Sequence, residues 1–243
     1  MSTIALSSNP LLELWRRLRL RIRFKFVLPR VRTGVLEGIK LDISALSPFM
    51  KNIILTGRYE SQERRLTAHA MTKDDVVLEL GGAIGFIGLY CLKVLGVKHV
   101  TSVEANPHTL QQLRRNYELN GMKPHVIHAA AAAEDGELDL NIGGEFWENT
   151  VTATSGKTLR VPVRSLRSLV QMMHQPPTTL VCDIEGAEVY LNFHELPDCM
   201  TKIIIELHPA SVGNSAIGEV LAKLAACGFQ KRGQLDDVYF FCR

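Results

Sequence analysis

The stretch VVLELGGAIGFIG, from Val76 to Gly88, decides the fold because it joins an apolar run to a cluster of glycines. The run at residues 76–80 predicts a buried strand, with Glu79 near its end. Glycine permits a sharp turn and a close approach of a ligand to the backbone, and a helix that begins there offers free N–H groups. The stretch therefore predicts a ligand-binding turn between a strand and a helix, with glycines at Gly81, Gly82, Gly85 and Gly88.

The spacing of these glycines separates two classes of nucleotide-containing cofactor. Nicotinamide and flavin cofactors require G-x-G-x-x-G, and no three of the glycines stand at that spacing. The pattern acid-x-Gly-x-x-x-Gly is present at Glu79, Gly81 and Gly85, and it is the first motif of S-adenosylmethionine-dependent methyltransferases. That cofactor carries an ammonium group, and we expect the carboxylate of Glu79 to lie beside it.

A second acid ends the next predicted strand. The segment SVEANP places Glu104 nineteen residues after Gly85. A carboxylate at this position can accept hydrogen bonds from two ribose hydroxyls, and Asn106 would lie on the adenine side. Dinucleotide-binding proteins use the same acid, so it supports a nucleoside cofactor without choosing between the two classes. The alternative is that Glu104 caps a helix beginning near His108.

Strands and helices alternate after residue 74, which predicts a parallel, doubly wound sheet. We expect an α/β fold with a Rossmann-like methyltransferase sheet, mostly parallel, with a C-terminal antiparallel hairpin strand and an N-terminal cap segment. Ligands bind such sheets beyond the carboxyl ends of the strands. The predicted strands are residues 76–80, 99–104, 125–129, 179–184 and 202–207, and the predicted helices are residues 84–95, 108–120, 166–174, 187–193 and 217–227.

Two further segments interrupt or close this alternation. Residues 137–142 and 158–165 alternate apolar and polar side chains, which predicts a β-rich excursion that turns at Gly143 and Gly144. Residues 229–232 and 238–242 predict the terminal hairpin. The loop EFWENT, residues 145–150, is a candidate substrate loop, in which Trp147 either stacks on a sugar ring or anchors the loop.

The first 70 residues differ from the remainder of the chain. We expect residues 1–70 to form a basic arm and a cap or lid segment, and residues 71–243 to form the S-adenosylmethionine-binding methyltransferase domain. Residues 61–71 predict a helix with Ser61 as its N-cap. The segment GRYE just before it would fold over the cofactor, with Tyr59 and Glu60 in contact. Tyr59 could equally pack at the seam between the two regions.

The positive charge is concentrated in the arm at residues 15–32. Of 28 Lys and Arg, eight lie between Leu14 and Leu36 without an acid, which leaves 20 against 25 Asp and Glu elsewhere, a balance of −5. Basic and apolar residues alternate in RLRLRIRFKF, which predicts a strand with one basic face or an interfacial segment. The alternatives are a solvated edge strand and peripheral contact with an anionic membrane. A nucleic acid partner is not expected, because few aromatic residues accompany the charge.

The composition is that of a globular protein in a reducing compartment. Of 243 residues 46% are hydrophobic and 22% are charged. No run reaches the ~20 apolar residues of a membrane span, and arginines interrupt the N-terminus where a signal peptide needs an apolar core. The five cysteines are odd in number and form no CxxC pair, which disfavours a disulfide framework or a zinc ribbon. We therefore expect a cytoplasmic protein, with Cys91 and Cys182 packed in the core.

The chain resembles the FkbM family of S-adenosylmethionine-dependent methyltransferases. The matching segments are GRYESQE (57–63), VVLELGGAIGFIGLY (76–90), VEANP (103–107), CDIEGAEVYL (182–191) and IIIELHP (203–209), in the family's order. The pattern D-x-E-G-x-E followed by I-E-x-H-P is the most discriminating part. The resemblance implies S-adenosyl-L-methionine as cofactor and O-methylation of a hydroxyl on a small molecule, such as a sugar, a glycan or a secondary metabolite.

The resemblance also indicates which residues would contact the cofactor. Many family members have Asp and Asn where this chain has Glu79 and Ala83, so the chain lacks one polar contact that the family offers. We expect cofactor contacts from Tyr59, Glu60, Glu79, Gly81, Gly82, Ala83, Gly85, Glu104, Ala105, Asn106 and Asp183.

Two pairs of polar residues end the fourth and fifth predicted strands. Asp183 and Glu185 are two residues apart, as are Glu206 and His208, and residues two apart on a strand share a face. Methyl transfer to an alcohol needs a base for the alcohol proton. We expect His208 to be this base because its ordinary pKa is ~6.5, with Asp183 as the second candidate. Glu185 and Glu188 would hold substrate hydroxyls.

Each of these assignments has an alternative. His208 could simply end its strand, and Glu188 could cap the helix that follows it. The carboxylates of Asp183, Glu185 and Glu206 are hard ligands that suit magnesium, but nothing in the sequence fixes their geometry, and we expect no metal.

Other function classes remain as alternatives. A protein that binds S-adenosylmethionine or a nucleotide without catalysis would keep the same fold. Nucleic-acid methyltransferases that act on amino groups usually carry the motif Asp/Asn-Pro-Pro-aromatic at the end of the fourth strand. This chain has Asp183 followed by Ile-Glu-Gly there, which argues against that class of enzyme. A dehydrogenase is disfavoured by the glycine spacing. The sequence does not predict an oligomeric state.

Overall fold

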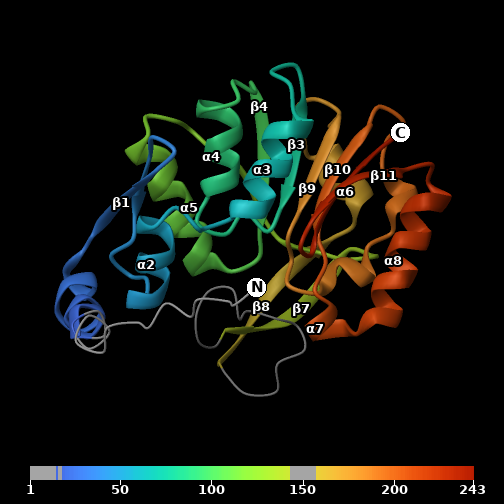
Figure 1. The fold of residues 1–243 in the computed structure, drawn as a ribbon. Coiled ribbons are helices and arrows are strands. Elements are labelled where there is room, and N and C mark those ends of the chain that lie inside the picture. The colour runs from blue at the N-terminus through green and yellow to red at the C-terminus, as the bar shows by residue number, and fades with distance from the viewer. Residues whose placement is uncertain (1–14, 16–17, 143–156) are drawn as a thin grey trace, which may run out of the picture.

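A computed structural model of the chain describes Trp15, residues 18–142 and residues 157–243. The predicted turn at Gly143 and Gly144 and the predicted substrate loop with Trp147 lie outside the described residues. Figure 1 shows a central sheet with helices on both faces and a smaller sheet, formed by β7 and β8, below it.

The central sheet has seven strands in the order β11-β12-β10-β9-β3-β4-β5. Five of them are parallel to one another: β3 (Val76–Leu80), β4 (His99–Glu104), β5 (His125–His128), β9 (Thr179–Cys182) and β10 (Lys202–Glu206). The hairpin of β11 (Gln230–Leu235) and β12 (Val238–Cys242) adds to one edge, with β12 antiparallel to β10. The predicted mostly parallel α/β sheet with a C-terminal antiparallel hairpin strand is confirmed.

Helices cover both faces of this sheet. They are α2 (Pro48–Leu55), α3 (Ser61–Ala70), α4 (Phe86–Lys93), α5 (Pro107–Leu119), α6 (Leu166–Gln171), α7 (Pro209–Val212) and α8 (Asn214–Ala226). Side chains of α3, α4 and α5 pack with Val77 and Ile204 on one face, whereas α6 and α8 pack with Leu78 and Ile203 on the other. Because both faces are covered, all five residues of β3 are buried, and such strands read as continuous apolar runs.

The order of the strands reverses between β3 and β9. From β3 the chain proceeds outward through β4 and β5, and it then returns to the other side of β3 with β9 and β10. A crevice at the carboxyl ends of the strands is expected at such a reversal. The functional site described below lies at this place.

The N-terminal cap contributes to the same hydrophobic layer as α4. Strands β1 (Thr33–Leu36) and β2 (Ile39–Asp42) form an antiparallel hairpin, and their apolar side chains belong to one cluster with those of α2 and α4. Helix α3 follows. Its N-cap is Glu60, which has a left-handed φ of 49° and no side-chain cap bond. The prediction that Ser61 is the N-cap is therefore wrong: Ser61 is already helical, and its hydroxyl donates to Gln62.

The basic arm is helical and not extended. Residues 18–22 are α-helical, and the chain continues through the π-helical turn η1 (Arg23–Val27) and the 3₁₀ turn η2 (Leu28–Arg30). The predicted strand is wrong, because no described strand pairs with this segment. Backbone groups without a partner strand must bond within the segment, and Leu and Arg both favour a helix.

The excursion between β5 and β9 forms a second sheet. Strands β6 (Ala130–Ala131), β7 (Gly136–Ile142) and β8 (Lys157–Arg164) lie in the order β6-β8-β7, and β7 and β8 are antiparallel. The predicted β-rich excursion is confirmed.

The helix predicted at residues 187–193 is wrong. The chain forms only the 3₁₀ turns η4 (Ala187–Tyr190) and η5 (Phe193–Glu195) there. The buried carboxylate of Glu188 accepts hydrogen bonds from the backbone N–H groups of Ile184, at 3.0 Å, and Gly186, at 3.3 Å. The chain therefore closes around this side chain and does not wind into a longer helix.

Two further expectations concern the cysteines and membrane spans. Cys91 and Cys182 are fully buried in the core, as predicted, and all five cysteines are free thiols. In the part of the chain that the structure describes, no helix combines the length and the apolar character needed to cross a membrane.

Candidate active site

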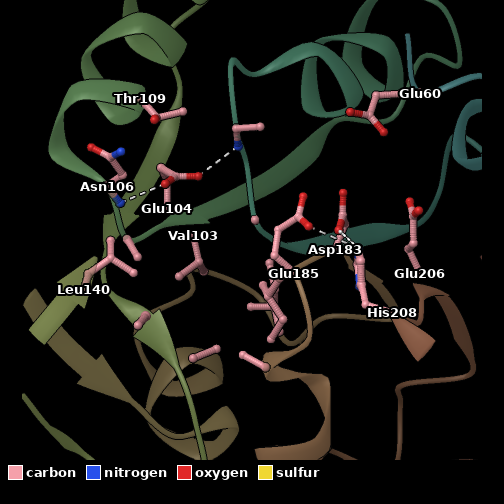
Figure 2. Close-up of a pocket in the computed structure, with 18 of the residues that line it drawn as sticks. Glu60, Val103, Glu104, Asn106, Thr109, Leu140, Asp183, Glu185, Glu206 and His208 are labelled. Atoms are coloured by element: carbon pink, nitrogen blue, oxygen red, sulfur yellow. Dashed lines mark hydrogen bonds and ion pairs between the residues drawn. The ribbon is translucent and has the colours of Figure 1, made fainter. Parts of the chain in front are cut away.

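A cavity of about 650 Å³ lies at the carboxyl ends of β3, β4, β9 and β10. Figure 2 shows that its labelled side chains fall into two groups. We call the part around Glu104, Asn106 and Thr109 the nucleoside half. We call the part around Glu60, Asp183, Glu185, Glu206 and His208 the acidic half. Both halves line the same cavity, so one elongated ligand can contact both.

The glycine turn lies between the two halves, and the protein itself fills the space beside its glycines. A Cβ atom on Gly81, which has a φ of +83°, would lie 1.7 Å from the carbonyl oxygen of Asp183. A Cβ on Gly85 would lie 2.9 Å from Leu113, and one on Gly88 would lie 2.2 Å from the hydroxyl of Tyr117. The glycines therefore allow β9 and α5 to pack against the turn.

Gly81 is the only one of the four glycines in this turn that lines the cavity. Gly82 and Gly85 were predicted to contact the cofactor, but the structure places them behind the cavity wall, against Leu113. Ala83 does line the cavity and has a φ of 42°. Its backbone N–H donates to Oε2 of Glu104 at 2.9 Å. The left-handed region is unfavourable for alanine, so this hydrogen bond is made by a strained residue.

The carboxylate of Glu79 does not line the cavity. It accepts hydrogen bonds from the backbone N–H of Gly88, at 2.9 Å, and from the hydroxyl of Ser102. Burial raises the pKa of Glu79 to about 7. This placement does not support the predicted contact with a cofactor ammonium group. Through these two hydrogen bonds, Glu79 instead connects β3 to α4 and to β4.

Glu104 does line the cavity, and the backbone on both sides orients it. Oε1 accepts from the N–H of Asn106 at 2.8 Å, and Oε2 accepts from Ala83. Burial raises the pKa of Glu104 to about 7, although these backbone hydrogen bonds act in the opposite direction. The cap of α5 is Asn106, whose side chain accepts from the N–H of His108 at 2.9 Å. The alternative that Glu104 caps this helix is therefore wrong.

The acidic half forms as the sequence predicted, because β9 and β10 are parallel neighbours. Nε2 of His208 lies 3.4 Å from Oδ1 of Asp183 and 3.4 Å from Oε2 of Glu185. Nδ1 of His208 lies 3.3 Å from Oε1 of Glu188. Glu206 and Glu60 complete the group at the cavity wall (Figure 2). One imidazole ring is thus surrounded by carboxylates.

This crowding changes the protonation of the group. Burial alone would lower the pKa of His208, but the close Glu188 and the charges of Asp183 and Glu185 outweigh it and raise the pKa to about 9. Burial, with repulsion from the neighbouring carboxylates, raises the pKa of Glu185 and of Glu206 to about 7. Burial and the neighbouring carboxylates Glu60 and Glu206 also raise the pKa of Asp183 well above its ordinary value. The ligand-free cluster therefore retains protons near neutral pH.

Glu188 is fully buried and lies behind the cavity wall. It accepts from the backbone of the β9–η4 turn and approaches His208. This placement does not support the prediction that Glu188 holds a substrate hydroxyl. The alternative prediction is that Glu188 caps a helix. Its carboxylate does accept from backbone N–H groups, as a cap does, but these groups belong to a turn and not to a helix.

Tyr59 and Glu60 both line the cavity. The ring of Tyr59 is buried and packs on Phe86, with ring centroids 5.7 Å apart, so it contributes to the seam as well as to the cavity. Ala105 is also at the wall, and its carbonyl oxygen lies 3.0 Å from Nε2 of His128.

Two sets of described residues bring potential metal ligands together. The ligand atoms of Asp183, Glu188 and His208 lie within 4.8 Å of one another, as do those of a second set, Glu60, Glu63 and Asp183. Neither is the set that the sequence suggested for magnesium. Two carboxylates and an imidazole are suitable ligands for a divalent cation. The proton that His208 carries at neutral pH also balances the negative charge of these two carboxylates, and a bound cation would have to displace it.

Sequence reasoning missed the apolar walls of the cavity. They come from Phe49, Met50 and Ile53 on α2, from Leu138 and Leu140 on β7, and from the alanines 129–132. The polar Thr109 on α5 was also missed. A run of five alanines directly after β5 is the one signal that could have indicated open space there, because small side chains leave room at the ligand-binding edge.

Three solved structures are similar to this chain to different degrees. The methyltransferase FkbM from Methylobacillus flagellatus KT has a TM-score of 0.50 and 16% identity, and the match covers 81% of this chain and 53% of that one. P. horikoshii TYW2, in complex with MeSAdo, has a TM-score of 0.47 and 13% identity, covering 86% and 68%. The ribosomal protein L11 methylase from Lactobacillus delbrueckii subsp. bulgaricus has a TM-score of 0.44 and 15% identity, covering 73% and 74%.

The similarity to the first of these structures shows a shared fold, and this chain spans about half of that protein's length. No curated protein sequence matches the chain. The family model of the methyltransferase FkbM domain matches residues 79–231, from β3 into β11. That match takes in more than half of the chain and includes the turn after β3, Glu104 and all residues of the acidic half except Glu60. The chain therefore belongs to the FkbM methyltransferase family, whose members depend on S-adenosylmethionine.

Proposed function

We propose that this protein transfers a methyl group from S-adenosylmethionine to a hydroxyl of a sugar, a glycan or a secondary metabolite. The observation that carries the proposal is that Glu104 and the acidic half line one cavity at the strand reversal. The first supplies a ribose site and the second supplies carboxylates that accept hydrogen bonds from hydroxyls. A cavity of about 650 Å³ is within the usual range for small-molecule sites.

The residues of the cavity fit this cofactor in two respects. The carboxylate of Glu104 accepts backbone hydrogen bonds from Ala83 and Asn106, and a carboxylate has about four lone-pair sites, which leaves capacity for a ribose hydroxyl. The acidic half has an excess of carboxylates, which the positive charges of the cofactor would balance. When bound, S-adenosylmethionine supplies an electrophilic methyl group on a positively charged sulfur.

The base is a carboxylate in this proposal. At a pKa of about 9, His208 is already protonated at neutral pH and does not accept the alcohol proton. Asp183 is our first choice, because it lines the cavity and its Oδ1 faces the charged imidazole of His208 at 3.4 Å. The positive charges of the cofactor would favour its ionised form, which can take a proton. In the transfer, the bond between the methyl carbon and sulfur would break as the hydroxyl oxygen bonds to that carbon, which leaves S-adenosylhomocysteine, and Asp183 would take the hydroxyl proton. The protonated His208 holds Asp183 and Glu185 in place through Nε2.

Neutral hydroxyls are the acceptors that the acidic half favours. Carboxylates accept hydrogen bonds from the hydroxyls of a sugar, whereas the same negative charges repel a phosphate backbone, whose binding depends on Lys and Arg. The only basic side chains at the cavity wall are Arg58 and His208, as far as the described residues go. This supports a small-molecule or glycan acceptor over a nucleic acid.

The first test is calorimetric titration with S-adenosylmethionine, with NADH as the control ligand. We expect S-adenosylmethionine to bind and NADH not to bind. Glu104→Gln should weaken binding by about tenfold or more, because a hydrogen bond to a charged group contributes ~1.5–3 kcal/mol. Glu118→Gln, on the exposed side of α5, is the matched control and should bind like the wild type. A preference for NADH would overturn the proposal.

A second test separates an enzyme from a protein that only binds the cofactor. Labelled methyl transfer is measured with a panel of sugars, glycans and polyketide alcohols. We expect transfer to at least one class of hydroxyl acceptor and its loss in Asp183→Asn, with cofactor binding retained. Binding without transfer to any acceptor would favour the non-catalytic alternative.

A further inference from the structure

The N-terminal helical segment exposes a row of large apolar side chains. Trp15, Leu18, Ile22 and Phe26 are 61%, 45%, 46% and 50% exposed. They are spaced by three, four and four residues, so a helix places them on one face. We call these four residues the apolar ridge. Exposed apolar rows with polar neighbours mark interaction sites more often than isolated side chains do.

Basic residues accompany the ridge. Between residues 18 and 26, every second residue is basic: Arg19, Arg21, Arg23 and Lys25. No acid lies between Leu14 and Leu36. None of these four forms an ion pair with another described residue. No described carboxylate therefore neutralises these side chains, which suits them to a negative surface outside the protein.

We propose that this segment docks the protein on the surface of an anionic lipid bilayer. The apolar ridge would enter the boundary between head groups and acyl chains, and the basic side chains would meet the head groups. Trp, Phe and Leu beside Lys and Arg are the composition of interfacial helices, and each Lys or Arg near an anionic surface strengthens the attraction to it. Nucleic acid fits less well, because Leu18 and Ile22 offer neither stacking nor hydrogen bonds.

The docking segment is connected to the rim of the cavity. η1 and η2 pack against α2, and Nζ of Lys51 on α2 donates to the carbonyl of Pro29 at 3.2 Å. Phe49, at the start of α2, lines the cavity and is 56% exposed. Figure 1 shows the N-terminal helical segment and α2 side by side at the lower left. A docked protein would hold this rim close to the bilayer, whatever the reaction inside the cavity.

The test is co-sedimentation with vesicles of phosphatidylcholine alone and of phosphatidylcholine mixed with phosphatidylglycerol. We expect binding only to the mixed vesicles. Ile22→Ser/Phe26→Ser, which leaves the charge unchanged, and Arg19→Gln/Arg23→Gln should each weaken binding by about tenfold or more. Lys98→Gln/Lys123→Gln removes two exposed charges near the amino ends of β4 and β5, and this control should bind like the wild type.

Tryptophan fluorescence gives an independent measurement. The chain has two tryptophans, so Trp147→Phe leaves Trp15 as the reporter. Its emission should shift to the blue when mixed vesicles are added, and it should not change with phosphatidylcholine alone. The variants keep the folded protein intact in this proposal, because the ridge is exposed, and their urea unfolding midpoints should match the wild type.

Three outcomes would overturn the proposal. One is the absence of binding to either kind of vesicle. Another is that Ile22→Ser/Phe26→Ser leaves vesicle binding unchanged and that the protein binds poly(A) as well as it binds vesicles. The segment would then be a general site for polyanions. The third is a dimer in solution that these two substitutions convert to a monomer, which would make the ridge an interface between two copies of the chain.

Discussion

The two halves of the cavity are built on opposite principles. In the nucleoside half, the carboxylate of Glu104 is held by backbone N–H groups on both sides. In the acidic half, the carboxylates of Asp183 and Glu185 lie 3.4 Å from Nε2 of His208, and the cluster is held by charged side chains and not by the backbone. The first half is held in place by the backbone and keeps acceptor capacity for a ligand. The second holds protons while it is free of ligand, and a positively charged ligand would favour their release.

The largest expected effect comes from breaking the acidic half at its proposed base. Asp183→Asn keeps the size of the side chain but removes its ability to take a proton. General-base catalysis contributes ~10²–10⁴-fold to a rate, so kcat should fall by that order once an acceptor is known. The cofactor Kd should change much less, as measured by calorimetry. A normal kcat would assign the proton to another carboxylate, and Glu185→Gln is then the next variant.

The next effect concerns the place where the halves meet. Gly81→Ala would put a methyl group against the carbonyl of Asp183, at a φ of +83°. We expect the free energy of unfolding to fall by ~3 kcal/mol or more in urea denaturation. Gly96→Ala is the matched control, because Gly96 has a φ of +73° and no atom within 4 Å of the added Cβ. Only the backbone strain remains there, so its loss should be ~1 kcal/mol.

The protons that the acidic half binds should make the free energy of unfolding depend on pH. The pKa of Glu185 and of Glu206 is raised from 4.5 to about 7 in the folded state. Their contribution to stability is therefore present below pH 4.5 and is lost as the pH rises to about 7. The pKa of His208 is raised from 6.5 to about 9, so its contribution is full below pH 6.5 and is lost as the pH rises through 9. All three make the ligand-free protein less stable as the pH rises.

Chemical denaturation across this pH range measures the slope. In Glu185→Gln/Glu206→Gln, the slope below pH 7 should become smaller. Saturating S-adenosylmethionine should flatten the dependence in the wild type, because its positive charges favour the ionised carboxylates. A stability that rises with pH in the ligand-free protein would contradict the raised pKa values of these three side chains.

The smallest effect tests the nucleoside half. Ala83 holds Glu104 through its N–H while at a φ of 42°, and glycine adopts that conformation without the same strain. Ala83→Gly should raise the free energy of unfolding by ~0.5–1 kcal/mol. The control Ala222→Gly, at an exposed position inside α8, should lower it by ~1 kcal/mol. Equal losses in the two variants would show that Ala83 is not strained.

The fold and the outline of the site follow from the sequence for a physical reason. Buried parallel strands have apolar residues on both faces, so β3, β9 and β10 stand out as runs. The carboxyl ends of parallel strands meet at one edge, which brings Asp183 and His208 together from distant parts of the sequence. The polar residues at strand ends can therefore be grouped from the sequence alone.

The direction and the environment of single side chains could not be predicted in this way. Glu79 belongs to the β3 face that packs on α4, and only the positions of Ser102 and Gly88 show that its carboxylate is occupied. The pKa of His208 depends on how many carboxylates surround the ring, which no spacing shows. The alternation in the basic arm indicated a strand, but a strand needs a partner, and none of the described strands is one.

The apolar walls of the cavity have a consequence for how the family's chemistry can diversify. Phe49 on α2 and Leu140 on β7 line the cavity without a polar side-chain atom, and they lie on elements outside the central sheet. Exchanging them for larger or smaller side chains would reshape the space for the acceptor and leave every hydrogen bond of Glu104 and His208 in place. Under the proposed function, such a protein can take a different acceptor through a change in the shape of the cavity alone, while Asp183 and His208 stay the same.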